Sequence, residues 1–442
     1  MITSNAWRGK RFAVLGLARS GQATVRALLA SGAEVLAWDT SDERREKAVD
    51  AAQQVSHDLE QVGLRIADPL TLDLTGFAGV VVSPGVPLNK HPIAGHAASF
   101  GVPVIGDVEL FAQARAELPA HKVVGITGTN GKSTTTALVD HICRTAGISS
   151  LAGGNIGLPI LEVEPVLEGG AYVLELSSYQ IDLTTSLDCD VAVLLNITPD
   201  HLDRYDGFEG YAASKARLFA MQSAGHAAVI GIGDAVSAAI ARGLATSGRS
   251  ADLTKIAPGV CMDQSRWPAL QGPHNAQNAL AAIAVCEALG IDQAAIDRGL
   301  ATFGGLPHRM ERVATRKGVL FVNDSKATNP TSTAPALAAF DRIHWIVGGL
   351  AKTDDLDACR PGFGHVVKAY TIGEASALFA TLLAGDMAVE RSGTLEAAVR
   401  SAAAQAAPGD TVLLSPACAS FDQFKDFEAR GRAFRDAVEA LG

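Results

Sequence analysis

The fold of this chain is set by the stretch Gly125-Ile126-Thr127-Gly128-Thr129-Asn130-Gly131-Lys132-Ser133-Thr134. The apolar pair Val123-Val124 precedes it, and the helix-compatible segment Thr135-Thr136-Ala137-Leu138-Val139 follows it. A β-branched run that breaks into glycines and then into a helical segment predicts a strand, a phosphate-binding loop and a helix. The sequence therefore predicts a site for a polyphosphate.

Each residue type in this loop has a physical reason. Glycines allow tight turns that bring backbone N–H groups close to phosphate oxygens, and the new helix adds the positive end of its dipole. Lys132 adds a positive charge, and Ser133, or alternatively Thr134, offers a hydroxyl to the Mg²⁺ of a nucleoside triphosphate. The usual pattern has glycine where Ile126 stands, so the loop is a variant, and the disfavoured alternative is an incidental glycine-rich turn.

Composition narrows the class of protein. At 442 residues the chain exceeds one ordinary core, and about three domains are expected. Its net charge is −10, from 47 acidic and 37 basic residues, without a long basic run, so nucleic acid and anionic membranes are poor candidates for partners.

The six cysteines lie far apart without a C-x-x-C pair, which favours buried thiols over a zinc site or disulfides. With neither a leader-like start nor a segment long enough to span a bilayer, a cytoplasmic location is expected.

The first part of the chain predicts a Rossmann-like unit. A strand over 11–15 ends at Gly16, a helix runs to Ala30, and a strand over 34–38 ends at Asp39-Thr40. The spacing Gly16-x-x-x-x-Gly21 lacks the middle glycine of a dinucleotide fingerprint, so we favour a nucleoside diphosphate and keep a purely structural role as the alternative. Ser83-Pro84-Gly85 ends a later strand in a rigid turn that is typical of ligand-facing strand ends.

The second part carries acidic and imidazole groups at predicted strand ends. A helix is predicted over 108–117, a strand over 172–178 contains Glu175, and a strand over 191–196 precedes Asp200-His201-Leu202-Asp203. Such groups at successive strand ends of a doubly wound sheet are candidates for metal ligands. Lys215 lies in a predicted helix over 211–220, and the sequence alone favours a solvent-facing lysine there.

The last part predicts another α/β unit. An alanine-rich helix to Leu289 follows Gly272, and strands are predicted over 319–322, 344–347 and 411–414, with a helix over 395–406. The predicted fold class is α/β with three domains. They are a Rossmann-like domain over 1–110, a central P-loop-type mononucleotide-binding domain over 111–304 and a Rossmann-like domain over 305–442.

Eight segments together resemble the Mur ligase family, in the family's order and across all three parts. The last two resemble most the members that add D-glutamate. The segments are Gly128-Thr129-Asn130-Gly131-Lys132-Ser133-Thr134, Gly153-Gly154-Asn155-Ile156-Gly157, Glu175-Leu176-Ser177-Ser178-Tyr179-Gln180, Asp200-His201-Leu202-Asp203-Arg204-Tyr205, His274-Asn275, Leu306-Pro307-His308-Arg309, Asn323-Asp324-Ser325-Lys326-Ala327-Thr328-Asn329 and Ser415-Pro416-Ala417-Cys418-Ala419-Ser420-Phe421-Asp422-Gln423-Phe424.

The resemblance implies ATP-driven amide formation in the synthesis of peptidoglycan precursors. The carboxylate of UDP-N-acetylmuramoyl-L-alanine takes the γ-phosphoryl group of ATP, and the amine of D-glutamate attacks the resulting acyl phosphate and expels phosphate. Because the reactants are anions, cations have to offset their repulsion. The resemblance also implies two Mg²⁺ sites, and a monomer is expected.

The resemblance assigns the ATP and metal ligands residue by residue. Ser133 and Glu175 are expected to coordinate one Mg²⁺, His201 the second, and Lys215 to act as a carbamate beside them. Lys326 is expected near the nucleotide or near the reacting groups, two roles that the sequence leaves open. The expected ATP-binding residues are Gly128, Thr129, Asn130, Gly131, Lys132, Ser133, Thr134, Asn275, Asn278, Arg309 and Asp324.

The resemblance divides the substrate-binding residues between two substrates. The UDP-muramoyl substrate is expected to meet Gly16, Arg19, Asp39, Ser83, Asn155 and Ser177. D-Glutamate is expected to meet Thr328, Lys352, Ser420 and Phe427, with a surface role as the alternative for Lys352 and, less favoured, for Ser420. Some family members have an arginine after the Asp-Thr pair where this chain has Ser41, and Arg19 is the candidate substitute.

Other classes of function remain as alternatives. Another amino-acid-adding Mur ligase or a ligase similar to folylpolyglutamate synthase shares the chemistry, and a nucleotide switch or a kinase also uses a phosphate loop with Mg²⁺. A dehydrogenase is disfavoured by the missing glycine. The division of the motifs among three domains further predicts closure of the last domain onto ATP.

Overall fold

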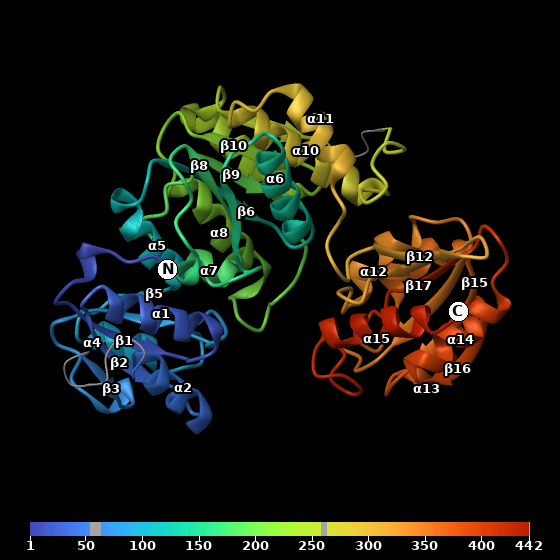
Figure 1. Ribbon diagram of the computed structural model, residues 1–442, viewed down its shortest axis with the longest axis horizontal. Helices are drawn as coiled ribbons and strands as arrows, with labels where there is room; N and C mark the ends of the chain where they lie inside the picture. Colours follow the sequence, from blue (N-terminus) through green and yellow to red (C-terminus); the bar gives the residue numbers. More distant parts are fainter. Residues whose placement is uncertain (54–62, 258–262, 442) are drawn as a thin grey trace. The chain divides into compact units, whose positions relative to one another are not determined.

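The computed structural model describes residues 1–53, 63–257 and 263–441 and contains three β-sheets, which confirms the α/β class. Figure 1 shows them in the blue, green and orange to red parts of the chain. The chain forms two compact units, Met1–Pro258 with Leu280–Gly299 and Gly259–Ala279 with Leu300–Gly442. The first two sheets therefore share a unit.

The first sheet has five parallel strands in the order β3-β2-β1-β4-β5, which is the Rossmann order of its first five strands. Its apolar strand residues are buried on both faces by helices, as expected for a parallel sheet. Its elements are β1 (Arg11–Leu15), α1 (Arg19–Ala30), β2 (Glu34–Trp38), α2 (Asp42–Gln53), β3 (Leu64–Ile66), β4 (Phe77–Val82), α4 (Ile93–Ser99), β5 (Val104–Ile105) and α5 (Asp107–Ala114).

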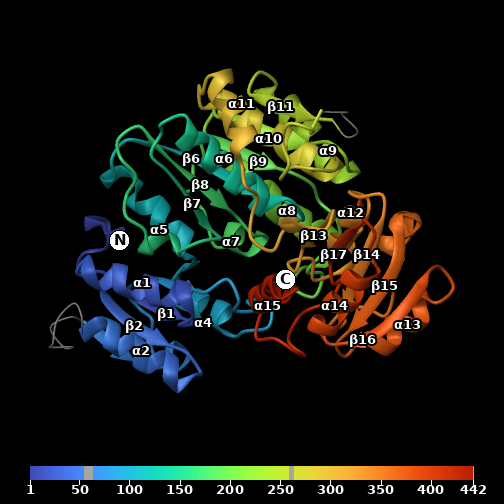
Figure 2. The same cartoon turned by 45° about the vertical axis from the view of Figure 1, so that its right-hand side comes forward.

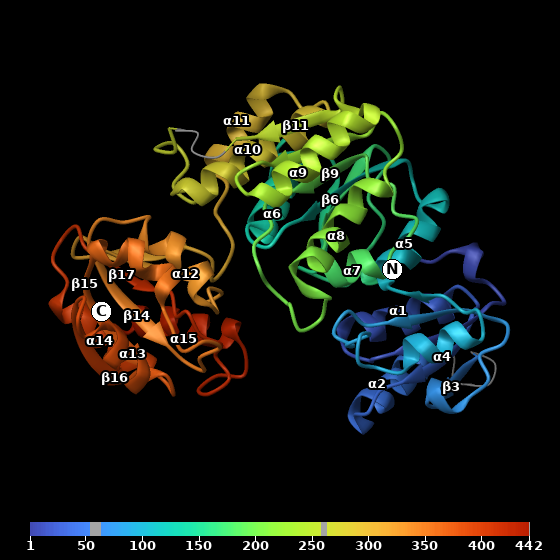
Figure 3. The ribbon, with the colours of Figure 1, turned by 180° about the vertical axis from the view of Figure 1, so that it is seen from behind.

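The second sheet has six parallel strands in the order β11-β10-β9-β6-β8-β7. The crossovers β6–α6–β7 and β9–α8–β10 run in opposite directions along it, so right-handed connections place α6 and α8 on opposite faces. Figure 3 shows α8 and α9 in front of this sheet. Its elements are β6 (His121–Thr127), α6 (Lys132–Thr145), β7 (Ser150–Gly154), β8 (Gly170–Glu175), α7 (Ser178–Asp182), β9 (Val191–Leu194), α8 (Gly207–Ala220), β10 (Ala227–Gly231), α9 (Ala235–Leu244), β11 (Leu253–Ile256), α10 (Pro273–Ala288) and α11 (Gln293–Thr302).

The third sheet has the order β12-β13-β17-β14-β15-β16, with β12 antiparallel at one edge and the other strands parallel (Figure 2). Neighbouring residues of β14 face opposite layers, because Trp345 packs in one apolar cluster and Ile346 in another. Its elements are β12 (Glu311–Arg316), β13 (Val319–Asn323), α12 (Pro330–Leu337), β14 (Ile343–Gly348), β15 (Val366–Ile372), α13 (Ser376–Leu383), β16 (Ala388–Gly393), α14 (Leu395–Gln405), β17 (Thr411–Leu414) and α15 (Phe427–Glu439).

One apolar core runs through the first two sheets and explains why they form one unit. Phe111 on α5 packs edge-on against Tyr172 on β8, with ring centres 4.9 Å apart. Both side chains belong to a cluster that also contains Val25 and Leu28 of α1. The predicted domain boundary near residue 110 thus falls within α5.

The ends of three elements differ from the prediction for local reasons. The strand predicted over 172–178 ends at Glu175, because Ser177 caps α7 by accepting a hydrogen bond from the Gln180 N–H. The helix predicted over 108–117 ends at Ala114 and continues as a short 3-10 turn. Helix α8 begins at Gly207, four residues before the predicted start at Tyr211.

The described cysteines are free and buried as predicted, and Cys261 lies outside the described residues. They are Cys143, Cys189, Cys286, Cys359 and Cys418.

Within the described residues, every helix is too short or too polar to cross a membrane.

Candidate active site

The phosphate loop follows β6, which lies between β8 and β9 in the middle of the second sheet. Gly128 and Gly131 have φ of +151° and +86°, a conformation that favours glycine. Helix α6 begins at Lys132 without a side-chain cap. The Lys132 ammonium donates to the carbonyls of Gly128 and Thr129, at 2.9 Å each, so the lysine lies over the loop as predicted.

Glu175 ends β8 beside this loop. Its carboxylate accepts hydrogen bonds from the Ser133 hydroxyl at 2.5 Å and from the Asn155 side-chain amide at 3.0 Å. The side chain of Glu175 is only 2% exposed. Gly154 precedes Asn155 with φ of +86°, and a Cβ there would lie 2.3 Å from the Glu175 carbonyl oxygen. The structure thus brings together three of the predicted site residues, Ser133, Asn155 and Glu175.

Lys215 is buried against the phosphate loop, so the sequence-only interpretation of a solvent-facing lysine is wrong. Its side chain is 1% exposed, and its ammonium donates to the Gly128 carbonyl at 3.0 Å and lies 4.7 Å from the Tyr211 ring centre. Burial, and next the charge of Lys132, lower the pKa of Lys215 to about 7. The periodicity of a helix does not show which face reaches a loop 80 residues earlier, and this is why the sequence alone misplaced it.

His201 follows β9 in a left-handed backbone conformation with φ of +53°. Its ring lies 5.2 Å from that of Tyr179 and about half of the side chain is exposed. Burial lowers the pKa of His201, Asp200 raises it, and the charges of Lys215 and Lys132 lower it further. Within the part of the chain that the structure describes, no three His, Cys, Asp or Glu side chains gather as a metal site.

The first sheet carries a separate pocket of about 860 Å³. The backbone around Gly16 and Gly21 needs glycine, because Gly16 has φ of +87° and a Cβ on Gly21 would lie 1.9 Å from the Gly16 carbonyl oxygen. Helix α1 then begins at Arg19 without a side-chain cap. Backbone N–H groups at such a helix start are suited to bind a phosphate.

Asp39 holds this loop in place. Its carboxylate accepts hydrogen bonds from the Leu17 N–H at 2.7 Å and the Ser41 N–H at 2.9 Å, and pairs with Arg44 at 3.3 Å. Burial alone raises the pKa of Asp39, but these hydrogen bonds outweigh it and hold the pKa below its usual value. Arg44 therefore stands beside the Asp-Thr pair, and Arg19 donates instead to the Gly157 carbonyl.

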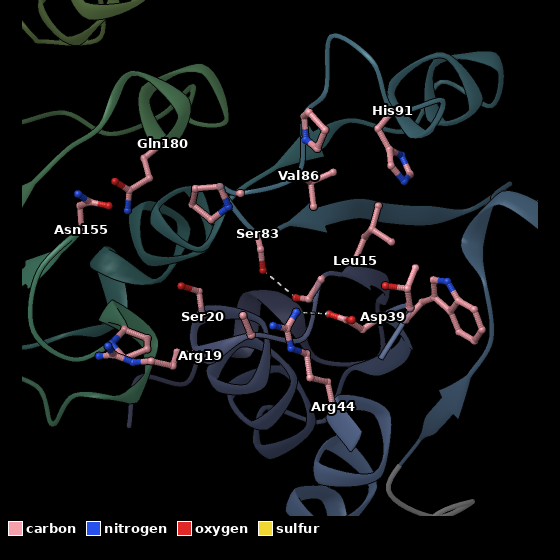
Figure 4. Close-up of a pocket in the computed structure, with 18 of the residues that line it drawn as sticks. Leu15, Arg19, Ser20, Asp39, Arg44, Ser83, Val86, His91, Asn155 and Gln180 are labelled. Atoms are coloured by element: carbon pink, nitrogen blue, oxygen red, sulfur yellow. Dashed lines mark hydrogen bonds and ion pairs between the residues drawn. The ribbon is translucent and has the colours of Figure 1, made fainter. Parts of the chain in front are cut away.

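The pocket extends from the first sheet to the second, within one compact unit (Figure 4). Trp38, Asp39 and Thr40 line it at the ends of the first-sheet strands, and Asn155 and Gln180 line it from the second sheet. The predicted residues Gly16, Arg19, Asp39, Ser83 and Asn155 all line it. Ser177 is the N-cap of α7, and its partner in the capping box is Gln180, three positions later.

In the second unit, Asp324 follows β13 and is buried. Its carboxylate accepts hydrogen bonds from the Ser415 hydroxyl at 2.8 Å and the Met310 N–H at 3.2 Å, and burial raises the pKa of Asp324 to about 7. Arg309 lies close enough for its charge to lower that pKa. Lys326 lies over the Phe427 ring at 3.9 Å, so these predicted residues share one neighbourhood.

Three of the residues predicted for the amino acid, Thr328, Lys352 and Ser420, lie on loops, and the fourth, Phe427, begins α15. Lys352 is exposed and its ammonium lies 3.4 Å from the Thr328 hydroxyl. Gly349 has φ of +132°, and a Cβ there would lie 2.4 Å from the Ala419 carbonyl oxygen, next to Ser420. The turn after β14 therefore packs directly on the run that contains Ser420, which is itself 2% exposed.

Asn275 and Asn278 lie one turn apart on α10. The Asn278 amide donates to the Asn275 side-chain oxygen at 3.1 Å, and the Asn275 amide donates to the Gln271 carbonyl. Both side chains are buried.

Sequence reasoning missed two residues that hold these loops. Asn196 follows β9 and binds the backbone of Asn130 in the phosphate loop, and the rule that polar groups at strand ends face ligands would have found it. Arg430 on α15 is 1% exposed and donates to carbonyls of Ser325, Cys418 and Ala419. It has no sequence signal, because arginines on helices are usually solvated.

Comparison with known proteins agrees with this arrangement. Family models match twice, the Mur ligase middle domain over residues 126–256 and the "Mur ligase, glutamate ligase domain" over 308–418. A protein from Novosphingobium aromaticivorans, named UDP-N-acetylmuramoylalanine–D-glutamate ligase, is 63% identical over 441 residues, covering 100% of this chain and 97% of its own. The chain belongs to the Mur ligase family.

Further Mur ligases support the assignment. The protein of the same name from Sphingopyxis alaskensis is 63% identical over 447 residues and covers 100% of both chains. Among solved structures, the UDP-N-acetylmuramate-alanine ligase of Thermotoga maritima matches 98% of this chain and 100% of its own, with a TM-score of 0.59 and 16% identity. At that identity the likeness supports the Mur ligase fold alone.

Proposed function

We propose that this protein is an ATP-dependent ligase that joins D-glutamate to UDP-N-acetylmuramoyl-L-alanine for peptidoglycan precursor synthesis, in the cytoplasm and as a monomer. Relatives whose names describe this ligase are 63% identical over the full chain. One structural observation carries the proposal, a continuous path of hydrogen bonds from the pocket to the phosphate loop. Asn155 lines the pocket and binds Glu175, and Glu175 binds Ser133.

This path supports one direction for the sugar nucleotide in the pocket. The diphosphate faces the start of α1 near Arg19, and the acid end of the substrate reaches Asn155. Because Asn155 hydrogen bonds to Glu175, the acid end of the substrate would then be separated from the Glu175 carboxylate, beside the phosphate loop, by one residue. A carboxylate is a poor electrophile until one of its oxygens becomes a good leaving group. Placing the substrate carboxylate beside the triphosphate loop favours the transfer of the γ-phosphoryl group to it.

The buried Glu175 carboxylate and the Ser133 hydroxyl are suited to hold one of the two Mg²⁺ ions that the resemblance implies. Mg²⁺ is commonly held by one or two carboxylates together with substrate phosphates, and a buried carboxylate bonded to a hydroxyl offers that here. Glu175 and Ser133 would hold one ion, and His201 with the carbamate of Lys215 would hold the second. Bound Mg²⁺ supplies charge stabilisation to the transferring phosphoryl group.

The chain's own residues account for the remaining charge. Lys132 and the start of α6 neutralise the β- and γ-phosphates while the substrate carboxylate attacks the γ-phosphorus and ADP leaves. Thr328, Lys352, Ser420 and the backbone at Phe427 receive the two carboxylates of D-glutamate. Its amine then attacks the acyl carbon, and the tetrahedral intermediate expels phosphate. Asn275, Asn278, Arg309 and Asp324 surround the nucleotide, with Lys326 at the reacting groups or the nucleotide.

A carbamate on Lys215 is supported by the burial of an amine between the Gly128 carbonyl and the Tyr211 ring. Carbon-13 bicarbonate would label the carbamate, and a carbamate signal that disappears in Lys215→Arg is the expected result. An unmodified lysine by mass spectrometry in active enzyme would contradict it.

The proposed activity is tested by phosphate release from ATP. Release is expected only when both D-glutamate and UDP-N-acetylmuramoyl-L-alanine are present, and Lys132→Ala should abolish it while the protein stays folded. Replacing D-glutamate by L-glutamate, L-lysine or D-alanine tests the acceptor. Release that ignores D-glutamate would favour a kinase or a nucleotide switch instead.

We also propose the three domains as 1–110, 111–304 and 305–442, because each range contains one sheet.

A further inference from the structure

The Asn196 side chain hydrogen bonds to both backbone polar groups of one residue in the phosphate loop, Asn130. Its side-chain oxygen accepts a hydrogen bond from the Asn130 N–H at 2.9 Å, and its side-chain amide donates to the Asn130 carbonyl at 3.2 Å. Its own carbonyl accepts the Thr129 N–H at 2.9 Å. Among uncharged side chains, Asn and Gln carry a donor and an acceptor on one planar group, as the backbone does.

Residues 127–130 of the phosphate loop and residues 195–198 after β9 form a seam, which is short and tightly packed. The Leu195 N–H donates to the Thr127 carbonyl at 3.0 Å, which continues the pairing of β9 with β6 into the loop. The Thr129 hydroxyl lies 3.1 Å from the Thr198 carbonyl and accepts the Thr198 N–H at 3.0 Å. A Cβ on Gly128 would lie 3.1 Å from the Leu195 Cβ, so the two strands of the seam are in contact.

The seam connects the phosphate loop to His201, which follows Asn196 by five residues. Tyr211 links the two segments, because its hydroxyl lies 3.2 Å from the Thr129 hydroxyl and its ring centre lies 6.3 Å from that of His201. Strand β9 ends at Leu194. Beyond that residue, backbone hydrogen bonds of Leu195 and Asn196, together with the Asn196 side chain, hold the phosphate loop against the segment that leads to His201.

We infer that Asn196 is a positioning residue for ATP, which holds the phosphate loop in register with the segment that carries His201. The inference rests on the proposed use of ATP at this loop. Asn196 acts through the backbone of Asn130 and is not required to touch the substrates.

The test is Asn196→Ala in the full-length protein, with kinetics for each substrate measured separately. Two neutral hydrogen bonds are lost, and an increase of about tenfold to thirtyfold in the KM for ATP is expected. The KM for D-glutamate should stay within about twofold, because the residues proposed for that substrate lie on the other compact unit. ATP binding measured by calorimetry should weaken by the same factor as the KM rises.

Two further variants keep the test decisive. Asn5→Ala removes one exposed side-chain hydrogen bond, from Asn5 to Glu117, and should leave every KM unchanged. If Asn196→Ala does not fold, Asn196→Asp keeps the size and the acceptor, loses the donor to the Asn130 carbonyl, and should also raise the KM for ATP selectively.

A folded Asn196→Ala or Asn196→Asp with the wild-type KM for ATP would overturn the inference, and so would an equal rise of every KM. If the wild-type protein binds no ATP, the proposed function fails instead.

Discussion

Arg44 shows how one residue can supply a charge that a local motif lacks. The chain has Ser41 after the Asp39-Thr40 pair, yet the side chain of Arg44, in the first turn of α2, pairs with Asp39 before the helix at 3.3 Å. It also lines the pocket that we assign to the UDP-substrate. A search restricted to the motif position misses such a substitution, because α2 brings the two positions together in space.

Arg44→Ala is therefore expected to raise the KM for UDP-N-acetylmuramoyl-L-alanine by about threefold to tenfold, because a half-exposed charge–charge contact is partly screened. The KM for ATP should not change. Lys47→Ala is the matched control, since Lys47 lies on the same helix and pairs only at the surface with Glu43. Steady-state kinetics decide between the two arginines of the pocket: an effect confined to Arg19→Ala would show that Arg44 has no part in binding.

At the scale of elements, the turn after β14 is the feature that aligns the loops of the second unit. Gly348 and Gly349 have φ of +129° and +132°, and both approach backbone oxygens of neighbouring segments. A side chain cannot be accommodated without moving the run from Ala417 to Ser420 away from Lys352. Gly349 thus determines the distance between its own turn and the loop at Ala419, 70 residues later in the sequence.

Gly349→Ala should raise the KM for D-glutamate at least about tenfold and lower the free energy of unfolding by roughly 1–3 kcal/mol, from strain and the clash with the Ala419 carbonyl. Gly364→Ala is the control, because a Cβ at Gly364 meets no atom within 4 Å and its φ is not left-handed. Chemical denaturation and acceptor kinetics measure the two effects. A Gly349→Ala protein as stable and as active as the control would disprove the role of the turn.

A buried polar network at the opposite end of the third sheet makes this sheet sensitive to pH. His344 on β14 hydrogen bonds through Nδ1 to the Tyr370 hydroxyl at 2.9 Å and through Nε2 to Asp410 at 3.2 Å. Burial lowers the pKa of His344 from 6.5, although Asp410 opposes the shift. Burial raises the pKa of Asp410, but hydrogen bonds from Arg342, the Ala407 N–H and His344 outweigh it and lower the pKa below 3.8.

Both shifts predict acid destabilisation. The unfolded chain binds a proton on His344 below pH 6.5 that the folded chain resists, so stability is present above 6.5 and is lost as the pH falls below it. Asp410 adds a further loss below pH 3.8. The urea concentration at the unfolding midpoint should fall between pH 7.5 and pH 5, and it should fall less for His344→Gln than for the wild type. An equal fall in the midpoint for both proteins would contradict this account.

At the scale of the whole molecule, the residues proposed for ATP are divided between the two compact units. Lys132 and Ser133 belong to the first unit, and Asn275, Arg309 and Asp324 belong to the second. A nucleotide bound by both sets of residues has to be held by both units. Ligand binding is therefore expected to be coupled to domain closure.

Small-angle X-ray scattering tests this prediction. The radius of gyration is expected to fall when a nonhydrolysable ATP analogue, Mg²⁺ and UDP-N-acetylmuramoyl-L-alanine are added together. Lys132→Ala should not respond to the same mixture, because it lacks the charge that holds the phosphates. Identical scattering curves for the free and liganded wild type would indicate a rigid molecule.

Local sequence patterns were sufficient for the elements and for the phosphate loop. Strands 11–15 and 34–38 were predicted with the bounds that the structure has, because apolar β-branched runs ending at glycine or aspartate are read within a few residues. The ends of helices were less accurate, since caps such as Ser177 depend on side-chain hydrogen bonds and not on periodicity.

The sequence by itself determined where the phosphate loop lies, which strands bear acid groups at their ends, and through its motifs the family. Tertiary structure alone decided that Lys215 is buried at the loop, that Asn155 joins the pocket to Glu175, and that Asn196 and Arg430 hold distant segments. The physical reason is the range of the interactions. Turns, strands and helix starts depend on neighbours within a few residues, whereas these contacts join segments brought together only when the parallel sheets assemble.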